Sequence, residues 1–118
     1  MDEQTTVASL MAKVAKFSHD RDWRQYHNQR NLAMALSVEA AELLELYLWC
    51  ADDGPQPAVK SRESRVEKEA ADVAITLLNF CDVAGIDLSA AVERKLAENA
   101  KKYPVSLVKG KMEKYDEY

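Results

Sequence analysis

The chain has 118 residues, a formal net charge of −4 and 47% apolar residues, which is enough for one domain with a hydrophobic core. Three glycines and three prolines are too few for an all-β chain with many turns. No basic tract occurs, so binding to a nucleic-acid polymer is not expected. No stretch has the roughly 18 apolar residues of a membrane span, and the first residues lack the pattern of a secretory signal. These features predict a cytoplasmic protein that binds no membrane.

The first half of the chain shows apolar residues at helical spacing in two segments. A first helix is expected over about 5–19, and a second over about 31–50 after a polar connection. Asn28 and Asn31 stand where this second helix begins; each is a candidate for its cap, with Asn31 favoured, or for a contact to a base. The second helix is apolar on nearly all sides, which favours burial between several helices and therefore an oligomer.

The second half begins with a loop that contains Gly54, Pro55 and Pro57. A third helix is predicted from 63 or 65 to 84, with Gly85 as its C-terminal cap. A fourth helix, capped by Asp87 or Ser89, should run to about Tyr103 and stop before Pro104. The prediction is an all-α four-helix bundle in one domain, 1–104, followed by a C-terminal tail, 105–118.

Two pairs of acidic residues lie inside the two most apolar helices. Glu39 and Glu42 are three residues apart in the second helix, and Glu69 and Asp72 are three apart in the third. This spacing places each pair on one helix face, so packing of the two helices would bring four carboxylates together. Their repulsion is relieved by a hard divalent cation such as Mg²⁺, which prefers oxygen ligands. A di-iron bundle fits less well because no histidine follows a glutamate at the required spacing.

The two cysteines form neither a CxxC motif nor a zinc-binding spacing. Cys50 and Cys81 each stand at the end of an apolar helical run. Buried, reduced thiols are the expected state.

The order ExxE, gap, ExxD resembles the MazG-like all-α nucleoside triphosphate pyrophosphohydrolases, here as EAAE from Glu39 and EAAD from Glu69. "RDWRQYHNQRNL" before the first acidic pair and "LYLW", which ends at Trp49, resemble the dCTP pyrophosphatase branch of that family. "KLAENAKKYP" resembles the family element K-x-x-x-N-x-x-[KR]-Y-P. The resemblance covers roughly residues 5–110. It implies Mg²⁺-dependent cleavage of the α–β phosphoanhydride, which releases a nucleoside monophosphate and pyrophosphate.

The resemblance also implies roles for individual residues. Glu39, Glu42, Glu69 and Asp72 would bind Mg²⁺, with Mn²⁺ as an alternative ion, and Glu39 is preferred as the group that orients or deprotonates the attacking water. The phosphate and sugar side of the pocket would be formed by Lys95, Asn99, Tyr103 and Lys102. The base pocket would be formed by Trp23, His27, Trp49 and Thr76. Thr76 departs from the branch, where a tyrosine stands, and this smaller residue puts a strict preference for dCTP in doubt.

The sequence therefore predicts a nucleotide pyrophosphohydrolase that cleans the deoxynucleotide pool, with dCTP or a related, modified nucleotide as its substrate. The resemblance implies a homotetramer, with a dimer as the alternative, in which Trp23 and His27 complete a neighbouring chain's pocket. Two rival hypotheses remain. One is a helical interaction module whose acids are surface features. The other is a related phosphohydrolase that acts on another pyrophosphate, such as a phosphoribosyl-ATP or a dUTP-like substrate.

Overall fold

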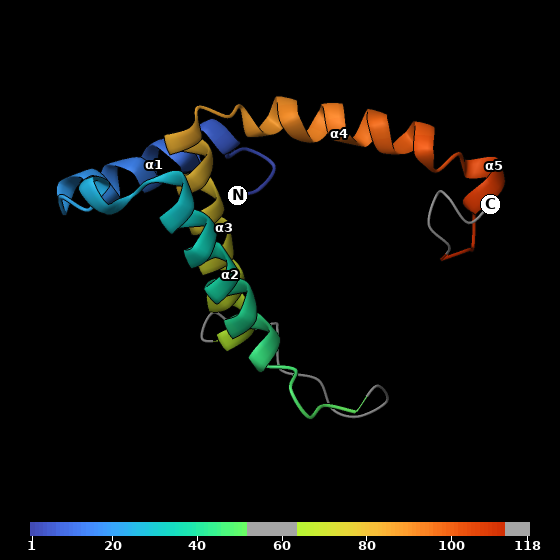
Figure 1. Cartoon of the computed structure of the whole chain (residues 1–118), viewed down its shortest axis with the longest axis horizontal. Coiled ribbons are helices and arrows are strands. Elements are labelled where there is room, and N and C mark those ends of the chain that lie inside the picture. The colour runs from blue at the N-terminus through green and yellow to red at the C-terminus, as the bar shows by residue number, and fades with distance from the viewer. Residues whose placement is uncertain (52–63, 113–118) are drawn as a thin grey trace. The chain divides into compact units, whose positions relative to one another are not determined.

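The computed structural model describes residues 1–51 and 64–112. In chain order, its elements are the helices α1 (Val7–Asp20), the 3₁₀ turn η1 (Arg24–Tyr26), α2 (Gln29–Glu45), α3 (Arg65–Ala84), α4 (Leu88–Lys102) and α5 (Val105–Val108) (Figure 1). No strand forms in these two ranges, so the all-α class is confirmed. The chain divides into two compact units, with the boundary in the sequence between Ile86 and Asp87.

The helix ends follow from local capping. The predicted caps at Gly85, with a left-handed φ of 70°, and at Asp87, which accepts a hydrogen bond from the Ala90 N–H, are confirmed. At α2 the favoured cap was wrong: Asn28 accepts from the Asn31 N–H at 2.8 Å, while the Asn31 side chain donates to the Tyr26 carbonyl. Asn28 takes this role because it has the extended backbone of an N-cap, whereas Asn31 already lies inside the helix.

The second helix is shorter than predicted. α2 ends at Glu45, and the chain continues in turns to Cys50. Trp49 has a φ of 67°, a left-handed conformation that cannot continue a right-handed helix. The residues after Glu45 are mostly apolar, so the predicted helical pattern continued beyond the true end of the helix. The predicted loop at Gly54, Pro55 and Pro57 lies outside the described residues.

The first unit is built around α3. Figure 1 shows α2 and α3 side by side in opposite directions, and these two helices pack against each other, with α1 against α3 as well. On the α1 side, the buried Ser18 hydroxyl donates to the Asn79 side-chain oxygen at 3.4 Å. The buried apolar side chains of the described chain are Leu32, Leu78 and Cys81. Both cysteines are free thiols, and Cys81 is buried as predicted, whereas Cys50 is only half-buried.

The outer face of α2 is apolar, as the sequence pattern predicted. Met34 and Val38 are each 56% exposed, and Leu44 is 68% exposed. These exposed side chains lie on the side of α2 that faces away from α3. The half-buried Ala35, Leu43 and Leu46 lie on the side toward α3. A surface helix normally carries polar groups on its outer face, so α2 has apolar surface available for a further contact.

The second unit consists of α4 and α5. α4 ends at Lys102, directly before Tyr103 and Pro104, as predicted. α5 forms within the segment assigned to the tail, and residues 113–118 lie outside the described residues. The boundary of the domain at residue 104 stays a prediction.

Across residues 1–51 and 64–112, no single helix is long and apolar enough to cross a membrane. α3 and α4 reach the required length and composition only if they are taken together as one interrupted pair.

Candidate metal centre

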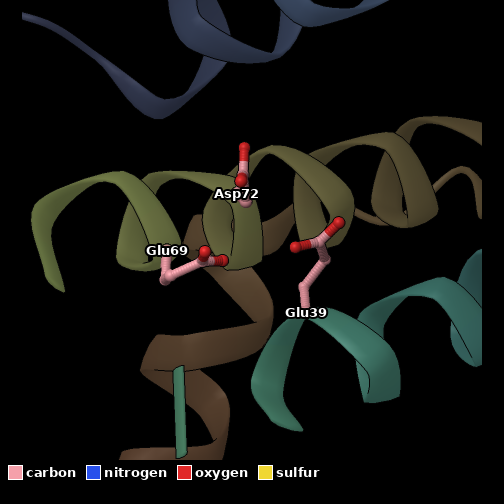
Figure 2. Close-up of side chains that lie close together, drawn as sticks. All are labelled: Glu39, Glu69 and Asp72. Carbon is pink, nitrogen blue, oxygen red and sulfur yellow. The ribbon is translucent and has the colours of Figure 1, made fainter. Parts of the chain in front are cut away.

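Three of the four predicted acids converge between α2 and α3. Glu39, Glu69 and Asp72 each present one carboxylate oxygen, and these three oxygens lie within 4.8 Å of one another. Figure 2 shows Glu39 rising from α2 toward α3, which carries the other two. Two effects bring these acids together. The i, i+3 spacing puts Glu69 and Asp72 on one face of α3, and the packing of α2 on that face adds Glu39.

Glu42 lies outside this group of three but acts on it. It is half-buried one turn after Glu39 on α2. Its negative charge raises the pKa of both Glu39 and Glu69. The structure therefore brings all four predicted acids into one electrostatic environment, although their role as metal ligands stays a prediction.

The carboxylates are poorly compensated by the protein itself. The Oε2 atoms of Glu39 and Glu69 are buried and have no hydrogen-bond partner among the described residues. Burial, followed by the charge of Glu42 and then that of Asp72, holds the pKa of both groups above the ordinary glutamate value of 4.5. In Glu69 the positive charge of Arg65 opposes this rise. A cluster of oxygen donors with unpaired buried atoms fits a hard divalent cation such as Mg²⁺.

Thr76 lies one turn after Asp72 on α3. Its hydroxyl donates to the Asp72 carbonyl oxygen at 2.9 Å, so the side chain is tied to its own helix. The neighbouring Ile75 lines an apolar hollow of about 200 Å³ between α1 and α3, together with Lys13, Val14 and Phe17. This hollow therefore begins about one helical turn from the acidic cluster.

Trp23 contacts Phe17, one of the residues that line this hollow. Its ring meets the ring of Phe17 edge-on, with 5.8 Å between centroids and 68° between planes, and the residue is 46% exposed. His27 is half-buried, and its Nδ1 atom has no hydrogen-bond partner among the described residues. Burial and then the charge of Arg24 lower the pKa of His27, so the imidazole is neutral near pH 7.

Trp49 does not join this group within the described chain. It follows α2 and is 94% exposed, so its indole faces solvent. A left-handed φ is rare for a bulky residue and occurs where surrounding structure or function requires it. Its predicted role as a base-stacking residue stays a prediction.

The predicted phosphate side lies on α4, in the second unit. Lys95 and Asn99 are one turn apart on this helix, and the Tyr103 N–H donates to the Asn99 carbonyl at 2.8 Å. Lys95 and Lys102 both pair with Glu98, each at 3.6 Å. Sequence reasoning missed Glu98, although its i+3 and i+4 spacing to these lysines was a readable signal.

A second missed pair joins η1 to α3. Arg24 donates to the Asp82 carboxylate in an ion pair between residues 58 positions apart in the sequence. No local spacing predicts such a contact, because only the packing of α1 and η1 on α3 creates it.

Known proteins resemble the chain over most of its length. The model of the MazG-like family matches residues 34–117. dCTP pyrophosphatase 1 of Bos taurus is 36% identical over 114 residues, which cover 95% of this chain and 68% of that protein. dCTP pyrophosphatase 1 of Homo sapiens is 35% identical over a match that covers 97% of this chain and 68% of that protein. The crystal structure of a pyrophosphatase from Archaeoglobus fulgidus matches with a TM-score of 0.69 and 39% identity, over 82% of this chain and 91% of that one. With its acids converging between two antiparallel helices, the chain belongs to the MazG-like family.

Proposed function

We propose that the protein is a Mg²⁺-dependent nucleoside triphosphate pyrophosphohydrolase. It cleaves the α–β bond of dCTP, or of a related or modified deoxynucleotide, to the monophosphate and pyrophosphate. The observation that carries this proposal is the convergence of Glu39, Glu69 and Asp72 in a chain whose relatives are named dCTP pyrophosphatases. Such an enzyme would remove unwanted nucleotides from the cytoplasmic pool.

The metal ligands would be Glu39, Glu42, Glu69 and Asp72. A bound Mg²⁺, or Mn²⁺ as the alternative, supplies charge to neutralise the phosphates and lowers the pKa of a bound water. The unpaired buried oxygens of Glu39 and Glu69 support this assignment, because a buried carboxylate is costly without a positive partner. Glu39 is the preferred group to orient the attacking water and accept its proton, since it faces the other two acids from the opposite helix.

The base of the nucleotide would lie in the hollow between α1 and α3. This hollow is apolar and includes Ile75, one turn from Asp72, and Trp23 contacts Phe17, another of the residues that line it. An aromatic surface next to an apolar hollow suits a flat base, because stacking on it contributes about 1–3 kcal/mol per base. His27 and Trp49 complete the proposed base pocket. The short Thr76, tied to its own helix, would leave room for a substituent on the base.

Phosphate and sugar contacts would come from α4. Lys95, Asn99, Lys102 and Tyr103 are the residues proposed for this role. Lys95 is engaged with Glu98 at 3.6 Å, but both side chains are more than half exposed, at 59% and 56%. An exposed pair of this kind contributes at most about 1 kcal/mol, so a triphosphate with several negative charges would compete effectively for the lysine.

We further propose that the chain works as a homotetramer, with a dimer as the alternative. The exposed apolar face of α2, with Met34, Val38 and Leu44, supports a contact with another copy. A charge placed in the centre of such an apolar contact would be desolvated without a partner.

The double variant Met34→Lys and Val38→Lys is therefore expected to shift the assembly to monomers or to a smaller oligomer. Light scattering coupled to size-exclusion chromatography would measure this. Glu3→Lys is the matched control, because it changes the charge at an exposed site before α1. If the double variant and the control have the same mass as the wild type, the α2 face is not the interface.

The decisive test of the proposed reaction is pyrophosphate release from a panel of canonical and modified nucleotides, with Mg²⁺ and with EDTA. We expect release that requires Mg²⁺, with one deoxynucleotide preferred by tenfold or more. Equal activity across the panel would keep the reaction but show that the pocket around Thr76 is unselective. A folded protein that releases no pyrophosphate from any nucleotide, and that Mg²⁺ does not stabilise, would instead be a helical interaction module.

A further inference from the structure

The Arg24–Asp82 ion pair differs in its position from the ion pairs within α1 and within α4. The side chains of Arg24 and Asp82 are 35% and 31% exposed, whereas those of Lys16 and Asp20 are 75% and 47% exposed. It also joins two elements, η1 and α3, rather than two turns of one helix. A partly shielded pair between elements is weakened less by solvent and salt than a pair on the surface of a single helix.

η1 is not held in place by buried side chains. None of the residues Arg24–Tyr26 is buried. An open hollow of about 340 Å³ adjoins this part of the first unit and is lined by Ala15, Lys16, His19, Arg24 and Asp82. Arg24 and Asp82 therefore meet at the wall of this open hollow. The ion pair is therefore a direct contact between η1 and α3.

The backbone around Arg24 links this contact to both ends of the segment Trp23–His27. The Trp23 carbonyl accepts from the Tyr26 N–H at 2.9 Å, and the Arg24 carbonyl accepts from the His27 N–H at 3.1 Å. Because these bonds close a single tight turn, the segment moves as one piece. An anchor at Arg24 therefore acts on this turn together with the Trp23 N–H, which donates to the Ser18 carbonyl at 3.0 Å and ties the start of the segment to α1.

We propose that the Arg24–Asp82 ion pair is a positioning contact that holds the segment Trp23–His27 in its substrate-binding place beside the apolar hollow. Neither residue touches the substrate in this proposal. Arg24 and Asp82 act through Trp23 and His27, so the inference rests on the proposed function for its assignment of those two residues to the base pocket.

The kinetic signature of a positioning contact is a change in KM. Arg24→Gln and Asp82→Asn should each raise KM for the preferred nucleotide about fivefold, within the range of coupling measured for contacting residues. They should change kcat less than about twofold, because the acids on α2 and α3 stay in place. The charge-reversed double variant Arg24→Asp with Asp82→Arg should bring KM most of the way back to the wild-type value. Asp20→Asn removes the exposed pair with Lys16, which lines the same open hollow as Arg24 and Asp82, and should leave KM unchanged.

A second readout does not depend on activity. The chain has two tryptophans, so in a Trp49→Phe background the fluorescence excited at wavelengths that tyrosine does not absorb comes from Trp23 alone. Adding Arg24→Gln should shift the emission to longer wavelength and increase quenching by acrylamide at least about twofold, because the segment would no longer be held beside Phe17. Adding Asp20→Asn should change neither, and the charge-reversed pair should restore the original spectrum.

These outcomes separate the inference from the proposed function. Unchanged fluorescence and KM in folded Arg24→Gln would overturn the inference, as would equal changes in Asp20→Asn. A variant that only melts at lower temperature, with native fluorescence and KM, would also overturn it, since the pair would then be merely structural. If the wild type hydrolyses no nucleotide, the proposed function fails, yet the fluorescence of Trp23 still decides whether the pair holds this segment.

Discussion

Asp72→Asn is expected to lower Mg²⁺-dependent pyrophosphate release about a thousandfold. Asp72 presents one of the three oxygens that lie within 4.8 Å of one another, and the substitution replaces a charged metal ligand by a neutral one. A metal ion at such a site contributes several kcal/mol to the transition state, and each 1.36 kcal/mol corresponds to a factor of ten in rate. The measurement is steady-state pyrophosphate release at saturating nucleotide and Mg²⁺.

The same substitution should not destabilise the metal-free protein. The charge of Asp72 raises the pKa of both Glu39 and Glu69, which means that the folded chain carries mutual repulsion at this site. In EDTA, Asp72→Asn should therefore melt at or above the temperature of the wild type. With Mg²⁺ at about one hundred times its Kd, the wild type should gain about 2.7 kcal/mol from binding to the folded state, and the variant should gain much less.

Glu67→Gln is the matched control for Asp72→Asn. Glu67 is an exposed acid in the first turn of α3, outside the cluster. It should keep both the activity and the stabilisation by Mg²⁺. A Glu67→Gln variant that loses as much activity as Asp72→Asn would show that general negative charge on α3, rather than the cluster, supports the reaction.

Mg²⁺ is expected to reverse the pH dependence of stability. The pKa values of Glu39 and Glu69 are raised in the folded state, first by burial and then by the charge of Glu42. Between the ordinary value of 4.5 and the raised values, the folded chain binds more protons than the unfolded chain. The contribution of these two groups to stability is therefore complete below the ordinary value and is lost as pH rises through the raised values.

Bound Mg²⁺ requires deprotonated carboxylates, so protons compete with it. The apparent affinity for Mg²⁺ should fall about tenfold per pH unit for each proton displaced, at pH values below the raised pKa of the displaced group. Stability with Mg²⁺ should consequently rise with pH over the range in which the contribution of the cluster in EDTA falls. Thermal melting from about pH 5 to about pH 8, together with titration calorimetry, would measure both effects.

Glu39→Gln removes one of the two titrating groups and should flatten both curves. Glutamine keeps the shape of the glutamate side chain but does not titrate. A change in the curves therefore reports the lost titration and not altered packing. Parallel stability curves with Mg²⁺ and with EDTA in the wild type would contradict binding of the ion at this cluster.

The helices themselves were readable because their signals are local. Apolar spacing, the cap at Gly85 and the stop before Pro104 act within a few residues, and the structure has helices at all four predicted places. The errors arose where local signals compete. Asn28 and Asn31 are chemically equal as caps, and the apolar residues up to Trp49 continue the helical pattern past Glu45 although the backbone has already turned.

By itself, the sequence determined which side chains share a helix face, and therefore that Glu39 and Glu42, like Glu69 and Asp72, form pairs. It did not determine that Glu39 reaches the acids of α3, because that depends on how two helices pack. The Arg24–Asp82 contact and the apolar hollow between α1 and α3 likewise arise from tertiary structure alone. Periodicity fixes the direction of a side chain around its own helix axis, whereas the distance between residues far apart in the chain is decided only when the apolar faces of different helices pack together.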